Sequence, residues 1–292
     1  MISPGIYHDM PEGEYHSAPG VSATILKAMR RSPAHMRVKL ADREDEDTPF
    51  GTIFHRRMLE PERYKAEIVI IPPDAPKRPT EAQRNAAKPS PKTLEQIAWW
   101  ADFDAKTEGK EIISATDASN IEKMAMAVLG HRIAGEIFRS EYRTEVSLFI
   151  DDPVTGLPIR CRVDLLSGVV MVDIKTTYDA SDWQFAKIID QMGYHLQAAH
   201  YMRIATLLGL APERFIFIAV EAKPPYGVNT FEIGAASLAK GDEECARLLA
   251  LYKECVEKDA WPAYEQSLRA INIPRYALTR EQDAEVIYSP ED

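Results

Sequence analysis

The chain has 292 residues, and its 45% hydrophobic content can build the core of one large domain or two small ones. Its formal net charge of −10 argues against a protein that coats nucleic acid nonspecifically, because such coating needs Lys and Arg to neutralise phosphates, but an enzyme acting on nucleic acid is not excluded. The three cysteines are far apart and form no CxxC pair, which excludes a disulfide framework and a four-thiolate zinc or iron–sulfur site.

Hydropathy and the N-terminus indicate the compartment. No apolar run approaches the roughly 20 residues that a membrane span needs. Residues 1–16 lack the charged-then-apolar order of a signal peptide. We therefore expect a soluble protein in the reducing cytoplasm, with no membrane partner.

Residues 1–140 are expected to be mostly helical. Capping residues and apolar periodicity predict helices over residues 23–31, from 33 onward, over 51–60, over 93–106 and over 116–138. A charged loop is expected over residues 42–47. Six prolines in residues 72–91 predict an irregular excursion, either an ordered crossing over the surface or a mobile flap.

Residues 141–292 read as a sheet-containing core. Alternating apolar residues and turn signals predict strands over 144–150, 157–166, 169–177, 215–222 and 228–233, and helices over 180–208 and 238–257. Because no repeat or linker interrupts this order, we expect residues 1–292 to form a single α/β domain with a mixed central β-sheet flanked by helices.

Residues 160–175, RCRVDLLSGVVMVDIK, predict a hairpin whose two-residue turn is Ser167–Gly168. That turn pairs Asp164 with Met171. Asp164, Asp173 and Lys175 then share one face, with the two aspartates as diagonal neighbours about 7–8 Å apart. The opposite face is uniformly apolar and is expected in the core; it comprises Val163, Leu165, Val170, Val172 and Ile174.

Two neighbouring carboxylates are unfavourable unless a cation neutralises them, and their hard oxygen ligands suit Mg²⁺ or Mn²⁺. A lysine beside such an ion can position a water and compensate charge on a phosphate. A solvated strand face with an ordinary Asp–Lys pair is the alternative, and the spacing alone does not decide between the two.

Residues elsewhere in the chain bear on this choice. Gln197 and Tyr201 are four residues apart on a predicted helix and share a face, with Tyr194 one turn earlier. His55 lies in the predicted helix over 51–60. Taken singly, Gln197 and Tyr201 can be part of a polar helix surface, and a lone histidine such as His55 is more often structural than a ligand.

Taken in order, these residues resemble a known family. Gly51 and His55 (GTIFH), Glu145 (TEVSLFI), Asp164 (RVDLL), Asp173 to Lys175 (DIK), and Gln197 with Tyr201 (QAAHY) are similar to the motifs of the PD-(D/E)xK nuclease superfamily. The likeness is to the exodeoxyribonuclease VIII-like recombination exonucleases of phages and prophages, and it extends through YHSAPGVSATILKAMRRSPAHMR and WPAY. One departure is that Val163, not proline, precedes Asp164.

The resemblance implies a restriction-endonuclease-like core and a metal-dependent exonuclease. Such an enzyme digests linear double-stranded DNA from 5′ ends and leaves a 3′ single-stranded tail for a single-strand annealing protein. It also implies a ring-like homo-oligomer, a trimer or tetramer, encoded by a phage or prophage and acting in the cytoplasm of a bacterial host cell.

The resemblance also implies residue roles. His55, Asp164, Asp173 and the backbone carbonyl of Ile174 would hold Mg²⁺, with Mn²⁺ possible. Lys175 would orient or activate the attacking water, and Glu145 would support the ligands or a second ion. Gln197 and Tyr201 would contact the substrate backbone or buttress Lys175.

Two basic clusters are candidates for binding DNA phosphates. One includes Lys27, Arg30 and Arg31, and the other lies in the Pro-rich segment and includes Arg84. One of these arginines is expected to receive a 5′ phosphate; a solvated surface is the alternative for each residue. Two other functions stay open: a noncatalytic scaffold that binds DNA ends, and an endonuclease on the same fold.

Overall fold

The computed structural model describes residues 2–41, 49–265, 267–273 and 278. The charged loop expected over residues 42–47 lies outside this part. No helix in the described residues is both long and apolar enough to cross a membrane.

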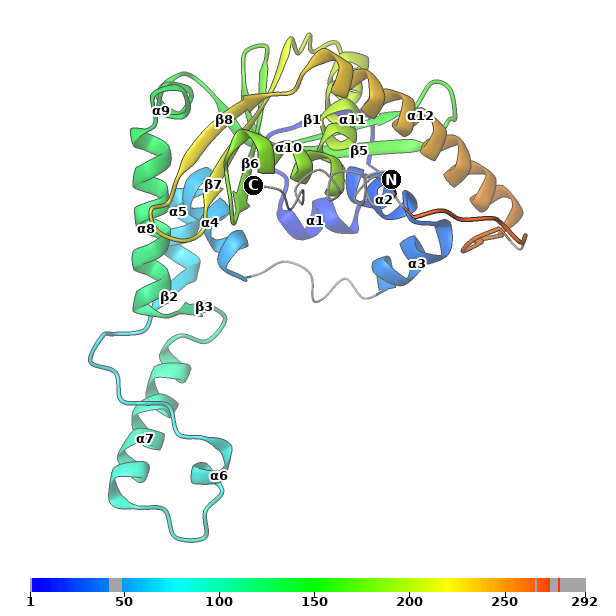
Figure 1. The fold of residues 1–292 in the computed structure, drawn as a ribbon. Coiled ribbons are helices and arrows are strands. Elements are labelled where there is room, and N and C mark those ends of the chain that lie inside the picture. The colour runs from blue at the N-terminus through cyan, green and yellow to red at the C-terminus, as the bar shows by residue number, and fades with distance from the viewer. Residues whose placement is uncertain (1, 42–48, 266, 274–277, 279–292) are drawn as a thin grey trace, which may run out of the picture.

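A six-stranded sheet forms the centre of the molecule (Figure 1), with the strand order β1-β4-β5-β6-β7-β8. Its strands are β1 (Gly5–Tyr7), β4 (Arg143–Asp151), β5 (Pro158–Ser167), β6 (Val170–Thr177), β7 (Arg214–Glu221) and β8 (Val228–Glu232). The pair β6 and β7 is parallel, and the other neighbours are antiparallel. The predicted mixed sheet is confirmed, although β1 was not predicted.

Helices cover both faces of this sheet (Figure 1). The first face packs against α2 (Ala23–Met29), α3 (Pro33–Ala41), α10 (Asp182–Gln191), α11 (Tyr194–Leu207) and α12 (Ala235–Lys258). The second packs against α4 (Pro49–Leu59), α5 (Pro61–Glu67), α8 (Ala115–Gly130) and α9 (Arg132–Arg139). Residues along β7 alternate between the two cores, as strand geometry requires: Phe215 and Phe217 lie in the first, Ile216 and Ile218 in the second.

Two helices expected to be continuous are broken. The helix expected over 116–138 divides at His131, whose ring nitrogen accepts a hydrogen bond from the Ala134 N–H and caps α9. The helix expected over 180–208 divides between α10 and α11 at Gly193, which has φ = 64°, a left-handed conformation that glycine adopts easily. Apolar periodicity continues through both breaks, so it concealed them.

Residues 72–91 were expected to cross the surface or to form a flap, and residues 93–106 to form a helix. Both lie between β2 (Ile68–Ile70) and β3 (Glu111–Ile113), two unpredicted strands that pair in parallel as a separate small sheet. The intervening residues, with α6 (Glu81–Arg84) and α7 (Pro91–Lys106), project from the body (Figure 1). We call residues 71–110 the arm.

The N-terminal segment packs at the edge of the main sheet that β1 forms. Its helix α1 (Glu12–Ser17) contributes Tyr15 to a small cluster with Met10, Ala18 and Phe149 of β4. The backbone oxygens of Tyr15 and His16 accept hydrogen bonds from Arg160 of β5. This segment therefore forms one wall of the region beside β5.

Gly241 sets how closely α12 can approach α11. A Cβ atom at this position would lie 2.3 Å from the backbone oxygen of His195. We expect Gly241→Ala to lower the free energy of unfolding by about 1–3 kcal/mol, because the two helices must separate. Gly130→Ala is the control, since a Cβ at Gly130, also helical, meets nothing within 4 Å. Urea unfolding measures both; equal stability of the two variants would contradict the packing argument.

Candidate active site

The site forms where β5 and β6 stop pairing. Their ladder joins Leu165 to Val172 and ends there, although both strands continue. We call this point the strand fork. In the same register, Asp164 lies level with Asp173, and the Asp164 carboxylate accepts a hydrogen bond from the Ile174 N–H at 2.8 Å. At the fork, the Asp164 side chain therefore accepts the hydrogen bond that a backbone carbonyl would accept in a continuous ladder.

The hairpin turn was predicted one residue too early. It consists of Gly168 and Val169, with Ser167 paired to Val170. Moving the turn by one residue displaces the partner of each strand residue by two. Because strands have a period of two, the side chains keep their faces. Asp164 and Asp173 are consequently direct neighbours across the fork, rather than diagonal ones.

A third carboxylate lies at the same level on β4. The β4–β5 ladder pairs Thr144 with Leu165 and Val146 with Val163, so Glu145 falls level with Asp164. The backbone of Glu145 has φ = 53°, which costs about 1–2 kcal/mol for a residue with a side chain. Three adjacent strands thus present one acidic residue each at the same level, one of them from a strained position.

Burial makes this carboxylate row unfavourable. Desolvation raises the pKa of Asp164 well above its usual value, and the charges of Asp173 and Glu145 raise it further. Desolvation also raises the pKa of Glu145 to about 7, although Arg162, 3.3 Å away, opposes the shift. The row therefore favours binding of a positive charge.

Lys175 provides one such charge. Its Nζ atom lies 2.7 Å from Asp173 Oδ2 and 4.6 Å from the centroid of the Tyr194 ring. Desolvation alone would lower the pKa of Lys175, but Asp173 and Asp164 outweigh it and the pKa is raised. Lys175 is therefore an ammonium ion, which donates hydrogen bonds.

The helix α11 holds the other side of Asp173. The Gln197 amide donates to Asp173 Oδ1 at 2.5 Å and accepts from Lys27 Nζ at 3.2 Å. Lys27 Nζ also lies 5.5 Å from the Tyr194 ring centroid. Gln197 thus connects α2 to β6, and its hydrogen bond in this structure is to Asp173, not to Lys175.

The break before α11 allows this arrangement. A Cβ at Gly193 would lie 3.1 Å from both Lys27 Cγ and Arg30 Nη1, so glycine leaves room for α2. Arg30 donates to the backbone oxygen of Asp190 at 2.8 Å and lies 3.3 Å from Glu244 of α12. Arg30 therefore fastens α2 beside the start of α11, which places Lys27 at Gln197.

His55 approaches the fork from α4. Its neighbours Phe54 and Met58 are buried in the second core, which fixes the helix. His55 Nδ1 lies 3.7 Å from Asp164 Oδ2. The N–H of Ile174 points toward β5, and the carbonyl of a strand residue points to the same side as its N–H. Oxygen and nitrogen donors from three elements thus converge at the fork.

These donors fit a divalent cation by their chemistry. Asp173 Oδ2 is buried and has no hydrogen-bond partner in the described part of the chain, apart from its ion pair with Lys175. No three His, Cys, Asp or Glu side chains in that part are already gathered around one point. A carboxylate oxygen has two lone pairs, so Asp173 Oδ2 can bind an ion beside its contact with Lys175.

The fork opens into a cleft of 790 Å³. Every predicted catalytic and metal-ligating residue lines it, as does Lys27: His55, Glu145, Asp164, Asp173, Ile174, Lys175, Gln197 and Tyr201. The other basic candidates do not. Arg30 is held by Asp190 and Glu244, Arg31 lies 3.4 Å from the Tyr264 hydroxyl, and Arg84 is on the arm.

Several cleft residues were not predicted. Arg160 and Arg162 line it beside Asp164, and both guanidinium groups lie over the Tyr15 ring. The alternation Arg160-x-Arg162-x-Asp164 in the sequence was the available signal, because these residues share a strand face.

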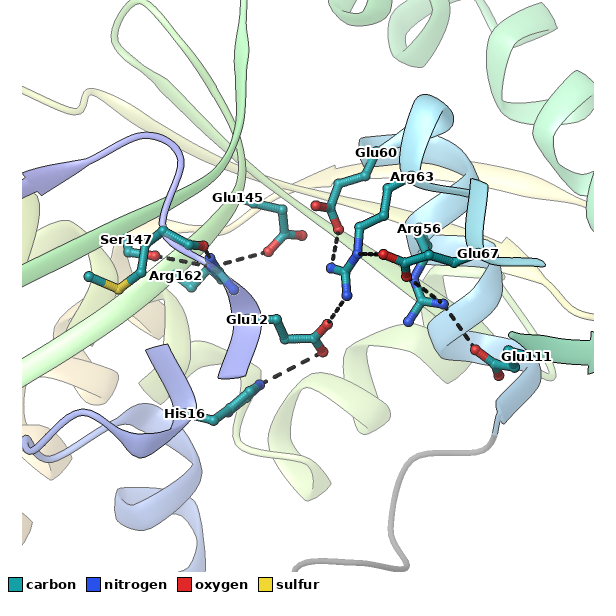
Figure 2. A network of polar contacts seen from close by, with 11 residues as sticks. Glu12, His16, Arg56, Glu60, Arg63, Glu67, Glu111, Glu145, Ser147 and Arg162 are labelled. Atoms are coloured by element: carbon teal, nitrogen blue, oxygen red, sulfur yellow. Dashed lines mark hydrogen bonds and ion pairs between the residues drawn. The ribbon is translucent and has the colours of Figure 1, made fainter. Parts of the chain in front are cut away.

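A polar network borders the cleft (Figure 2). Arg63 of α5 pairs with Glu12 of α1 at 3.1 Å, and Arg56 of α4 pairs with Glu111 of β3 at 2.9 Å. Glu12 and Arg56 also line the cleft. The network therefore joins the N-terminal wall, the helix of His55 and the base of the arm.

The chain belongs to a family of PD-(D/E)xK type. Residues 22–271 match the family described as PDDEXK-like domain of unknown function (DUF3799). The predicted superfamily and fold class are thereby confirmed. Enzymes of this superfamily generally use divalent metal ions. No curated protein sequence matches the chain significantly.

Three solved structures are similar to the chain to different degrees. A putative exonuclease from Eubacterium rectale is similar with a TM-score of 0.55 and 11% identity, over 93% of this chain and 98% of that one. A phage-related exonuclease from Haemophilus somnus has a TM-score of 0.33 and 12% identity, over 63% and 91% of the two chains. The alkaline exonuclease LHK-Exo from Laribacter hongkongensis has a TM-score of 0.28 and 18% identity, over 61% and 90%. Only the first of these three is similar enough to support the fold.

Protonation of Glu145 should make stability depend on pH. Because its pKa is about 7 in the folded protein and 4.5 for the free side chain, the folded state binds the proton more tightly than the unfolded state. The carboxylate therefore destabilises the protein above pH 7, and this cost disappears as pH falls to 4.5. We expect Glu145→Gln to be more stable than the parent at pH 8 by on the order of 1–3 kcal/mol, with no advantage at pH 4.5.

Denaturant unfolding in EDTA across this pH range measures the difference. Glu95→Gln, a change at an exposed residue of α7, is the control and should alter stability little at any pH. A difference between Glu145→Gln and the parent that stays constant from pH 4.5 to 8 would show that the Glu145 charge is not the cause.

Proposed function

We propose that residues 1–292 form a single metal-dependent exodeoxyribonuclease domain. It degrades linear double-stranded DNA from 5′ to 3′ and leaves 3′ single-stranded tails for recombination by strand annealing. The observation that supports hydrolysis best is the strand fork, where Asp164, Asp173 and Lys175 converge with His55 in a cleft of a PDDEXK-like fold.

We assign the metal to His55, Asp164, Asp173 and the Ile174 carbonyl, with Mg²⁺ as the ion and Mn²⁺ as a substitute. When bound, such an ion neutralises charge on the phosphate, lowers the pKa of water and assists departure of the 3′-oxygen. The donor set is dominated by oxygen, which suits these hard cations.

The chain's own residues supply orientation and charge. Lys175 is an ammonium donor that can hold a water or a nonbridging phosphate oxygen in place. Gln197 restrains Asp173, and the ring of Tyr194 restrains Lys175. Tyr201 lies on the same side of α11 and faces the cleft, where a substrate backbone would pass.

Digestion from DNA ends is supported by the similarity to the putative exonuclease from Eubacterium rectale. The resemblance to exodeoxyribonuclease VIII-like enzymes is the basis for four further proposals. These are the 5′ polarity, the annealing partner, the trimeric or tetrameric ring, and the phage or prophage origin in a bacterial cytoplasm.

Analytical ultracentrifugation tests the ring, and a monomer with full activity would contradict it.

Four basic residues are proposed to contact DNA. Lys27 is the best placed, because it lines the cleft beside Gln197. One of Arg30, Arg31 and Arg84 would receive the 5′ phosphate. Alanine variants of these three, compared on 5′-phosphorylated and 5′-hydroxyl ends, test this, and an unchanged preference in all of them would refute it.

Asp173→Asn should abolish digestion while leaving the fold intact. The change removes a ligand charge but keeps the shape of the side chain, so we expect a rate loss of at least about 10³-fold, comparable to the loss of a residue that stabilises transition-state charge. The assay uses linear duplex labelled separately at its 5′ and 3′ ends, with and without Mg²⁺.

A covalently closed circle of the same sequence is the matched substrate control. Metal-dependent release of the 5′ label with the circle spared is the expected result. Cleavage of the circle would favour an endonuclease. Binding of ends without hydrolysis would favour a scaffold, and full activity of Asp173→Asn would overturn the assigned site.

A further inference from the structure

The arm is a structured projection with its own small core. The Trp100 indole N–H donates to the Pro76 oxygen at 2.9 Å, and the Arg78 guanidinium lies 4.1 Å from the centre of the Trp100 ring. Arg78 also pairs with Asp104 at 2.6 Å. The rings of Trp99 and Phe103 are stacked 5.2 Å apart. The extended Pro-rich segment is thereby fastened along α7.

The base of the arm is connected to the catalytic cleft. Its two strands pair with each other, and Glu111 of β3 binds Arg56 of α4, the helix that also bears His55 (Figure 2). Arg56 itself lines the cleft. A molecule that binds the arm is therefore held at a position fixed relative to the site.

The arm carries most of its positive charge in one stretch. Residues 77–92 contain five Lys or Arg and one acidic residue, a net +4, whereas the whole chain carries −10. Arg78 is committed to Asp104. The other four basic residues are exposed and form no ion pair with any described residue: Lys77, Arg84, Lys88 and Lys92. Figure 1 places the α6–α7 connection, which includes Lys88, at the far end of the arm.

The chemistry of this surface suits a polyanion better than a protein. Trp100 is buried and Trp99 and Phe103 are turned partly inward, so Leu94 is the one large hydrophobic residue of the arm that is well exposed, at 53%. Protein interfaces usually centre on buried aromatic and apolar residues, which this surface does not offer. Unpaired cations on a projecting element in an acidic chain attract phosphates instead.

We propose that the arm grips the backbone of duplex DNA outside the catalytic cleft, through Lys77, Arg84, Lys88 and Lys92. The inference rests on the proposed DNA substrate and adds a second contact region to it. Phosphate contacts carry no base information, so the grip is independent of sequence. It keeps the duplex on the enzyme between hydrolytic steps.

The test is the salt dependence of duplex binding. Anisotropy of a labelled 40-base-pair duplex is measured in EDTA between 50 and 200 mM salt, for the parent and for a variant with Lys77→Gln, Arg84→Gln, Lys88→Gln and Lys92→Gln. Each lost phosphate contact lowers the slope of log K against log salt by about 0.9, so we expect a reduction of up to about 3.6. Affinity at low salt should fall by about 10- to 100-fold.

A matched variant separates the arm from net charge. Lys65→Gln, Lys240→Gln, Lys253→Gln and Lys258→Gln together remove the same number of surface positive charges from α5 and α12. This variant should bind the duplex nearly as the parent does. Tryptophan fluorescence reports whether the arm's core, with Trp99 and Trp100, stays folded in both.

Three results would overturn the proposal: no duplex binding by the parent, equal loss in both variants, or an arm variant that binds normally. A variant that binds DNA normally but changes oligomeric state would assign the arm to contacts between copies of the chain. Binding is measured without metal, so it is independent of hydrolysis. A protein that binds the duplex through the arm but does not hydrolyse it in Mg²⁺ would refute the proposed nuclease function and leave the arm proposal standing.

Discussion

The repulsion between Asp164 and Asp173 at the strand fork is the interaction on which the rest of the site depends. Around this pair, Ile174 N–H, the Gln197 amide and the Lys175 ammonium each contact one of the two carboxylates. These contacts compensate the charge only in part, because the pKa of Asp164 is still raised. A largely buried, undercompensated acidic pair is costly for stability and favourable for binding a cation, which is a common trade-off at catalytic sites.

The fold positions this pair through contacts far apart in the sequence. The core helix α4 directs His55 at Asp164, and the break at Gly193 lets α2 place Lys27 against Gln197 of α11. Arg30 fastens this junction to Glu244. The geometry of the candidate site is therefore a property of the packed domain, and the hairpin alone would not produce it.

The sequence predicted the face of Asp164, Asp173 and Lys175 correctly, because a pairing displaced by two residues preserves strand parity. It did not predict the strained backbone of Glu145 or the break at Gly193, since apolar periodicity is insensitive to a local φ. The three-residue strands β1, β2 and β3 are too short to show a pattern, and their pairing depends on distant segments. In the arm, the irregular segment over 72–91 and the helix over 93–106 were consequently predicted, but their joint projection was not.

The most direct test of the central claim is calorimetric titration of Mn²⁺ into the parent protein and into Asp173→Asn. If the carboxylates at the fork hold one divalent ion, the parent should bind Mn²⁺ and the variant should lose the binding heat while unfolding cooperatively at a similar or higher temperature. Equal Mn²⁺ binding by both proteins would contradict the account, because it would place the ion away from the fork.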